Sequence, residues 1–128
     1  MMLAKLLAIF VIGVLGGVSA SGQRVPAAVA LYQRGIVLAK SGDYRAAIEK
    51  LRAAVKANPK YYEAYVALAL SFQNTQQYSE ALETFSTAIK LRPRLAEPHM
   101  MLGRLIQQLG NADGALSEFQ TAAKLDPA

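Results

Sequence analysis

The sequence predicts an all-α fold, a solenoid of three stacked helical hairpins with about six helices. The first observation is a period of 34 residues, which the prolines Pro59, Pro93 and Pro127 mark. Two sets of alanines keep the same step: Ala47, Ala81 and Ala115, and then Ala54, Ala88 and Ala122. The second observation is that apolar residues within each period recur at spacings of three and four, as on one face of a helix. Repeats of this length are typical of hairpins that bury their apolar faces only by stacking.

Residues 1–20 have the layout of a secretory signal peptide. Lys5 supplies a weakly positive start, an unbroken apolar run covers residues 6–18, and Val18-Ser19-Ala20 offers small residues for cleavage. This apolar leader helix is shorter than the roughly 20 residues that span a bilayer. We therefore expect an exported protein, periplasmic or secreted. An uncleaved membrane anchor, with the repeats outside the cytoplasm, is the alternative.

The repeat domain is expected over residues 28–127, in units 28–61, 62–95 and 96–127, after a linker at 21–27. In the first unit, helices are predicted at about 28–40 and 44–56. Gly42 can adopt the left-handed conformation that ends the first helix, and Asp43 can cap the second. Asn58 and Pro59 end the second helix.

The middle unit has Gln76 and Gln77 where the first has Gly42 and Asp43. If this turn needs a positive φ, Gln76 costs on the order of 1 kcal/mol relative to glycine.

The third unit is predicted to start near Glu97, with its second helix near Asp113, and no polar capping helix follows it. The last helix is therefore expected to leave apolar surface uncovered, from Leu116, Phe119 and Ala123. This surface predicts either a frayed end, a homo-oligomer contact through the last helix, or a cap supplied by another protein.

Composition argues against catalysis and against a cofactor. The chain has no cysteine and one histidine, His99, which occupies a packing position of the repeat. Neither a zinc site nor a Ser-His-Asp arrangement is therefore expected, and we predict that the protein is not an enzyme and binds no metal. Aromatic residues lie at core spacing, which disfavours a nucleic-acid partner. Charge is uneven, since the first unit has seven basic and two acidic residues, whereas the third has two basic and four acidic residues.

The repeat resembles that of the tetratricopeptide repeat (TPR) family over about residues 28–127, without gaps. In the first unit the matching positions are Leu31, Gly35, Leu38, Ala47, Leu51, Ala54 and Pro59. In the second they are Tyr65, Leu68, Ala69, Phe72, Ala81, Phe85, Ala88 and Pro93. In the third they are His99, Leu102, Gly103, Ile106, Ala115, Phe119, Ala122 and Pro127. Arg34, in place of a usual leucine, and His99, in place of an aromatic residue, depart from the pattern. The resemblance implies a right-handed α-solenoid and a non-catalytic protein-interaction module.

In this family the first helix of each repeat lines a concave groove that binds peptide segments. Carried over, the expected groove residues are Tyr32, Ile36, Val66, Leu70, Gln73, Asn74, Met100, Met101, Arg104 and Gln107. The family's mode of clamping a C-terminal carboxylate is disfavoured, because Tyr32, Ile36, Ala67, Glu97 and Met101 occupy the corresponding places. An apolar centre with an amide-rich rim instead suits an apolar helix or extended segment of a partner protein. Alternatives are packing of these residues within the array, self-association as a structural role, and a membrane-tethered assembly or biogenesis factor.

Overall fold

The computed structural model describes residues 25–127, and this part of the chain folds into six α-helices. They are α2 (Ala27–Lys40), α3 (Tyr44–Ala57), α4 (Tyr62–Asn74), α5 (Tyr78–Leu91), α6 (Ala96–Gln108) and α7 (Ala112–Leu125). The predicted boundaries of the first two helices are confirmed to within a residue. The predicted leader and most of the predicted linker lie outside the described residues.

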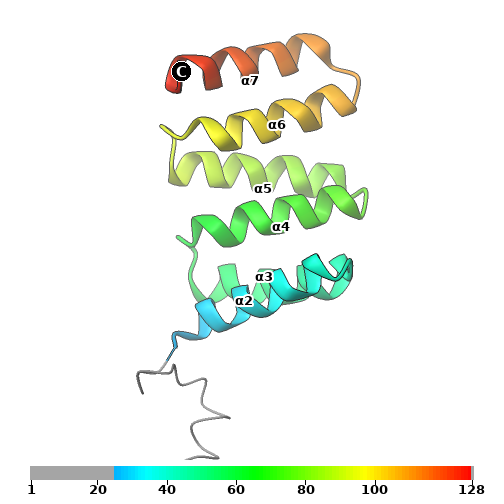
Figure 1. Cartoon of the computed structure of the whole chain (residues 1–128), viewed down its shortest axis with the longest axis vertical. Helices are drawn as coiled ribbons and strands as arrows, with labels where there is room; N and C mark the ends of the chain where they lie inside the picture. Colours follow the sequence, from blue (N-terminus) through cyan, green and yellow to red (C-terminus); the bar gives the residue numbers. More distant parts are fainter. Residues whose placement is uncertain (1–24, 128) are drawn as a thin grey trace, which may run out of the picture.

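The six helices form three hairpins that follow one another along the long axis of the molecule (Figure 1). The most extensive packing lies within hairpins, between α2 and α3, between α4 and α5, and between α6 and α7. Adjacent hairpins are joined by α3 against α4 and by α5 against α6. The arrangement is therefore a solenoid in which each hairpin packs on its neighbours, as the 34-residue period predicts.

The turn inside each hairpin uses one residue in the left-handed conformation. These residues are Gly42 with φ of 86°, Gln76 with φ of 62° and Gly110 with φ of 88°. Gln76 is the only non-glycine residue of the described chain with a positive φ, so the backbone conformation on which the expected cost depends is confirmed.

Side-chain caps at the second helices also follow the sequence. Asp43 Oδ1 accepts a hydrogen bond from the Ala46 N–H at 3.2 Å, as predicted. Asn111 Oδ1 accepts one from the Gly114 N–H at 2.9 Å. The middle hairpin has no side-chain cap at Gln77, so both its turn and its cap are weaker than those of its neighbours.

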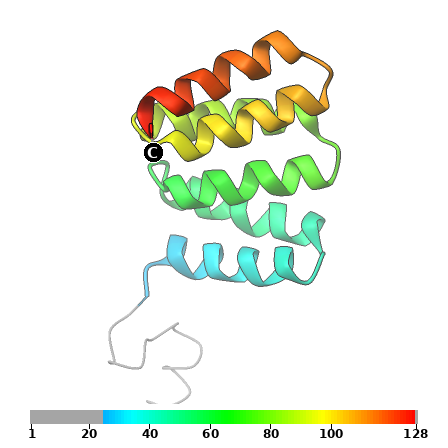
Figure 2. The same cartoon turned by 45° about the horizontal axis from the view of Figure 1, so that its top comes forward.

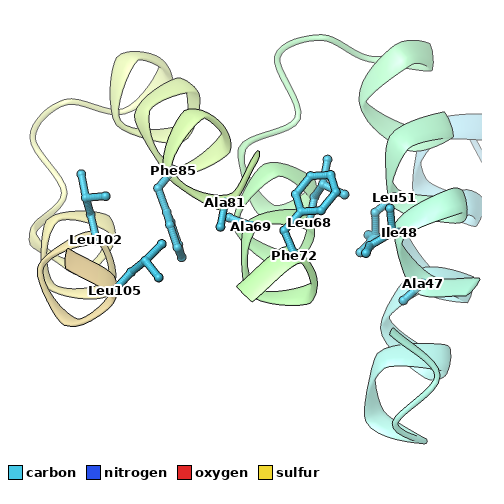
Figure 3. Packing of buried hydrophobic residues seen from close by; sticks show 10 residues of the cluster. All are labelled: Ala47, Ile48, Leu51, Leu68, Ala69, Phe72, Ala81, Phe85, Leu102 and Leu105. Carbon is cyan, nitrogen blue, oxygen red and sulfur yellow. The ribbon is translucent and has the colours of Figure 1, made fainter. Parts of the chain in front are cut away.

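The core runs through the stack without interruption, and Figure 3 shows ten of its residues. Ala69 and Ala81 are fully buried where α4 approaches α5, and Phe85 is fully buried beside them. Phe85 also points towards Leu102 and Leu105 of the next hairpin (Figure 3). One side chain therefore joins contacts within a hairpin to contacts between hairpins, which makes the core continuous.

Glycine replaces alanine at the closest approach within the two outer hairpins. A Cβ atom on Gly35 would lie 2.6 Å from Leu51 Cγ, and one on Gly103 would lie 2.7 Å from Phe119 Cε1. Both distances are shorter than any ordinary carbon contact, so the facing side chain occupies the space that a methyl group would need.

Candidate functional site

The first helices of the three hairpins, α2, α4 and α6, lie one above another and carry all the predicted groove residues (Figure 2). Helix α2 packs directly on α4, and α4 is linked to α6 by a hydrogen bond between side chains. Tyr32 and Ile36 lie on α2. Val66, Leu70, Gln73 and Asn74 lie on α4, and Met100, Met101, Arg104 and Gln107 lie on α6.

Three of these residues line one hollow of about 370 Å³ between α4 and α6. They are Leu70, Gln73 and Asn74, and the hollow is completed by Gln76, Tyr78 and Gln108. Leu70 is one of the exposed large apolar residues of the described chain, and the other five residues are polar. The hollow thus combines one apolar contact point with several amides, and Leu70 is the only one of the predicted apolar groove residues that lines it.

A chain of side-chain hydrogen bonds fixes the wall of this hollow. Gln73 Nε2 donates to Gln108 Oε1 at 3.0 Å, and Gln108 Nε2 donates to the Tyr78 hydroxyl at 3.3 Å. Asn74 Nδ2 donates to the Leu70 carbonyl at 2.8 Å. These bonds leave Gln73 Oε1 and Asn74 Oδ1 as acceptors for a peptide N–H.

At the other end of the groove, Tyr32 packs against Tyr61 with ring centroids 5.0 Å apart. Burial, and secondarily the nearby Glu63 carboxylate, raises the pKa of Tyr32. Glu63 in turn lies 3.1 Å from Arg92 Nη2, in a half-exposed ion pair. Aromatic faces and the ion pair of Arg92 with Glu63 therefore border this end of the groove.

The predicted methionines have different surroundings. Met101 is partly buried and packs against the core. Met100 is exposed and lines a separate hollow of about 330 Å³ with Ala96, Phe119, Ala122, Ala123 and Asp126 at the C-terminal end of the stack. The groove prediction treated the two methionines as one apolar centre, whereas the structure assigns only Met100 to an open hollow.

One feature of the site, the contact between Tyr78 and Gln108, has no signal in the sequence period. Tyr78 completes the hydrogen-bond chain from the first position of α5, where the other hairpins have Tyr44 and Ala112. The contact depends on the side-chain conformations of Tyr78 and Gln108, which no spacing rule specifies.

His99 has the packing position that the sequence predicts, and it also has a partner. It is partly buried, and its Nδ1 lies 2.7 Å from Glu118 Oε2 of α7. The pair joins the two helices of the last hairpin. Because the ring is held between α6 and α7, it serves the hairpin rather than an open site.

Neither a metal cluster nor a membrane span occurs in the described part of the chain. Within residues 25–127, no three histidine, aspartate or glutamate side chains gather in a way that could hold a metal ion. No helix in the same range is long and apolar enough to cross a bilayer.

The family follows from a match that covers most of the chain. The family model described as "Tetratricopeptide repeat" matches residues 32–93 and residues 66–128. The chain belongs to the tetratricopeptide repeat family. The two matches overlap within the middle hairpin, which agrees with three consecutive TPR units.

Solved TPR-type structures have the same fold as this TPR protein. "Crystal structure of MamA" superimposes with a TM-score of 0.77 at 24% identity, covering 80% of this chain and 60% of that one. "MamA 41-end from Desulfovibrio magneticus RS-1" gives 0.75 at 28% identity, covering 77% and 56%. "Second TPR of Spaghetti (RPAP3) bound to HSP90 peptide SRMEEVD" gives 0.72 at 25% identity, covering 78% and 93%. The right-handed TPR solenoid that the sequence predicts is thereby confirmed.

This TPR protein spans little more than half the length of the MamA chains that it matches. No curated protein matches the sequence.

Proposed function

We propose that this TPR protein is a non-catalytic interaction module that binds an apolar segment of a partner protein in the groove of α2, α4 and α6. The observation that carries the proposal is the hollow around Leu70, where an exposed leucine lies among amide side chains held by hydrogen bonds. An apolar side chain of the partner would bury Leu70, and its backbone would bond to the amides. The RPAP3 repeat, a structural relative, is described in complex with a peptide, which supports a peptide ligand.

The chemistry of the groove favours an apolar ligand over an acidic C-terminus such as that of the peptide SRMEEVD. The five places where the family's carboxylate clamp would stand hold no basic residue, and Glu97 is itself acidic. A carboxylate there would lose hydration beside apolar groups and be repelled by Glu97, and none of these five places holds a basic residue to offset that cost.

The setting of this interaction is also a proposal. The signal-peptide layout of residues 1–20 supports export to the periplasm or outside the cell. A partner there would be an exported protein or the exposed part of a membrane protein. If the leader is retained, the same groove would act next to the membrane surface.

The groove is tested by selecting peptides from a random displayed library on the purified protein. We expect enrichment of apolar sequences whose binding does not need a free C-terminal carboxylate. Synthetic versions of the selected peptides would then be measured by fluorescence anisotropy, with SRMEEVD as a non-binding reference.

A matched pair of variants assigns the binding to the groove. Leu70→Asp should weaken the selected peptides at least about tenfold, or roughly 1.4 kcal/mol. Leu95→Asp is the control, because Leu95 is 40% exposed, close to the 37% of Leu70, but lies in the loop between α5 and α6. Selection of acidic C-termini, or equal binding by the Leu70→Asp variant, would refute the groove proposal.

A further inference from the structure

The N-terminal end of the stack exposes an apolar position that is buried in the other two hairpins. Val37 of α2 is 67% exposed, whereas its equivalents one and two periods later, Ser71 and Leu105, are exposed by 1% and 0%. Val37 borders a hollow of about 390 Å³ together with Gln33, Arg34, Leu38 and Lys50. No hairpin precedes α2 within residues 25–127, so this end presents one half of an inter-hairpin junction.

The C-terminal end exposes the opposite half of the same junction. Leu116 of α7 is 55% exposed, whereas Ile48, two periods earlier, is 6% exposed. Beside it, Met100 and Phe119 line the hollow of about 330 Å³ described above. The predicted uncovered surface of the last helix is thus confirmed.

The chain already makes this junction twice within itself. Ile48 and Leu51 meet Leu68 where α3 joins α4, and Phe85 meets Leu105 where α5 joins α6 (Figure 3). Phe119 lies one period after Phe85, so in a continued stack it would pack against the position one period after Leu105. That position is Val37 of a second copy.

Charge favours the same pairing. The first hairpin carries seven basic and two acidic residues, and the third carries two basic and four acidic residues. Arg34 and Lys50 border the N-terminal hollow, and Asp126 borders the C-terminal one. Opposite charges at the two ends attract copies head to tail, whereas two C-terminal ends, both acidic, would repel each other.

Arginine at position 34 is better suited to a contact between two copies than to a junction between hairpins of one chain. Its equivalents, Leu68 and Leu102, are buried. At the end of the stack the methylene groups of arginine can cover apolar surface while the guanidinium remains at the rim, facing the acidic hairpin of the other copy. The departure from the TPR pattern at Arg34 thus has a physical reason.

We propose that copies of this chain associate head to tail, with the face of α2 and α3 around Val37 on one copy docked against the face of α6 and α7 around Leu116 on the next. The contact is heterologous, so it extends the solenoid into an open chain of copies instead of closing a dimer. The groove of α2, α4 and α6 would continue from copy to copy. This association does not depend on the groove ligand proposed above.

Sedimentation velocity tests the proposal on protein expressed from the full-length sequence without tags, with the N-terminus that the host leaves. Between about 1 μM and about 1 mM, a range that covers weak specific association, the average mass should rise through dimer and higher species. Val37→Glu and Leu116→Glu should each remain monomeric, because each buries a charge at one half of the contact. Both positions are exposed in the single chain, so both variants should retain their helical circular dichroism.

Mixing the two variants identifies the polarity of the contact. Each variant keeps one intact face, so an equimolar mixture should form a 1:1 pair and grow no further. Leu95→Glu, which lies on neither face, should assemble as the original does, and so should the groove variant Leu70→Asp. A monomer at every concentration, or a Val37→Glu variant that still dimerises, would overturn the proposal.

Discussion

Gln76 is a residue at which the middle hairpin differs from both of its neighbours, which have glycine there. Its φ of 62° is one that glycine adopts freely and that glutamine adopts at a cost. The sequence alone predicts this strain, because Gly42 and Gly110 stand at the same step of the period.

Gln76→Gly should therefore stabilise the protein by about 1 kcal/mol, as a rise in the midpoint of thermal unfolding. The control is Gln120→Gly in the helical interior of α7, which should lower stability by about 1 kcal/mol. A lower midpoint for Gln76→Gly would mean that the glutamine side chain contributes more than the backbone strain costs.

Tyr62 has a buried hydroxyl with no hydrogen-bond partner among residues 25–127. Burial, and then the nearby Glu97 carboxylate, raises the pKa of this group. Arg92 lies over the ring, 4.5 Å from its centroid. The ring therefore makes a favourable contact, whereas the buried hydroxyl has no hydrogen-bond partner among the described residues.

Tyr62→Phe should raise the free energy of unfolding by up to about 1 kcal/mol, since it removes an unpaired buried polar atom. Tyr65→Phe is the matched control, because the Tyr65 hydroxyl donates to the Pro59 carbonyl at 3.0 Å. That variant should lose about 1 kcal/mol in urea unfolding. Equal effects of the two substitutions would contradict the assignment.

Such residue-level details separate what sequence can predict from what it cannot. The turn conformations and the Asp43 cap depend on local backbone chemistry, which the residue types specify. The pairing of His99 with Glu118 and of Tyr78 with Gln108 depends on side-chain rotamers across two helices. Packing determines these rotamers, and the 34-residue period of the sequence carries no information about them.

At the scale of the helix pair, Gly35 and Gly103 occupy the same position but face different side chains. Leu51, opposite Gly35, is fully buried between hairpins, whereas Phe119, opposite Gly103, lies at the open end of the stack. In the middle hairpin an alanine at this position, Ala69, is accommodated beside Phe85. A methyl group is thus tolerable opposite phenylalanine when the ring can adjust.

Gly35→Ala should destabilise the protein by about 1–3 kcal/mol, because Leu51 has no free space to enter. Gly103→Ala should cost less, since Phe119 can move and alanine favours the helix by up to about 1 kcal/mol. Chemical denaturation of the two variants side by side measures the difference. If Gly103→Ala proved the more damaging, the open end would be more rigid than its exposure indicates.

The arrangement of helix pairs was accessible from the sequence because each pair repeats the same pattern. The groove was only partly accessible, since its strips follow from the TPR resemblance while its hollows depend on neighbouring side chains. Met100 is an example of what the repeat pattern does not predict. Its position in the repeat places it in the groove, but no fourth hairpin follows within the described residues, and Met100 lines a hollow that it shares with α7.

For the whole molecule, the two terminal helices bury the fewest residues and α4 buries the most. α2 buries only Ala28 and Gly35, and α7 buries only Ala115 and Ala122. α4, which packs against helices on both sides, buries six residues. A stack held by neighbour contacts opens from its ends.

Native-state hydrogen exchange should therefore show the slowest amide exchange in α4 and faster exchange in α2 and α7. The measurement is made well below the concentration at which copies associate, because docking of the two ends would protect them. Uniform protection of all six helices at low concentration would contradict the prediction and indicate a single cooperative unit.

The joint between α5 and α6 is the least extensively packed of those between consecutive helices. In a stack of hairpins, bending is greatest at the junction with the least extensive packing. The last hairpin, α6 and α7, should consequently tilt about this joint more readily than the first hairpin tilts about the joint between α3 and α4. A ligand bound across this joint would reduce the bending, so the stiffness of the protein would indicate whether the ligand is bound.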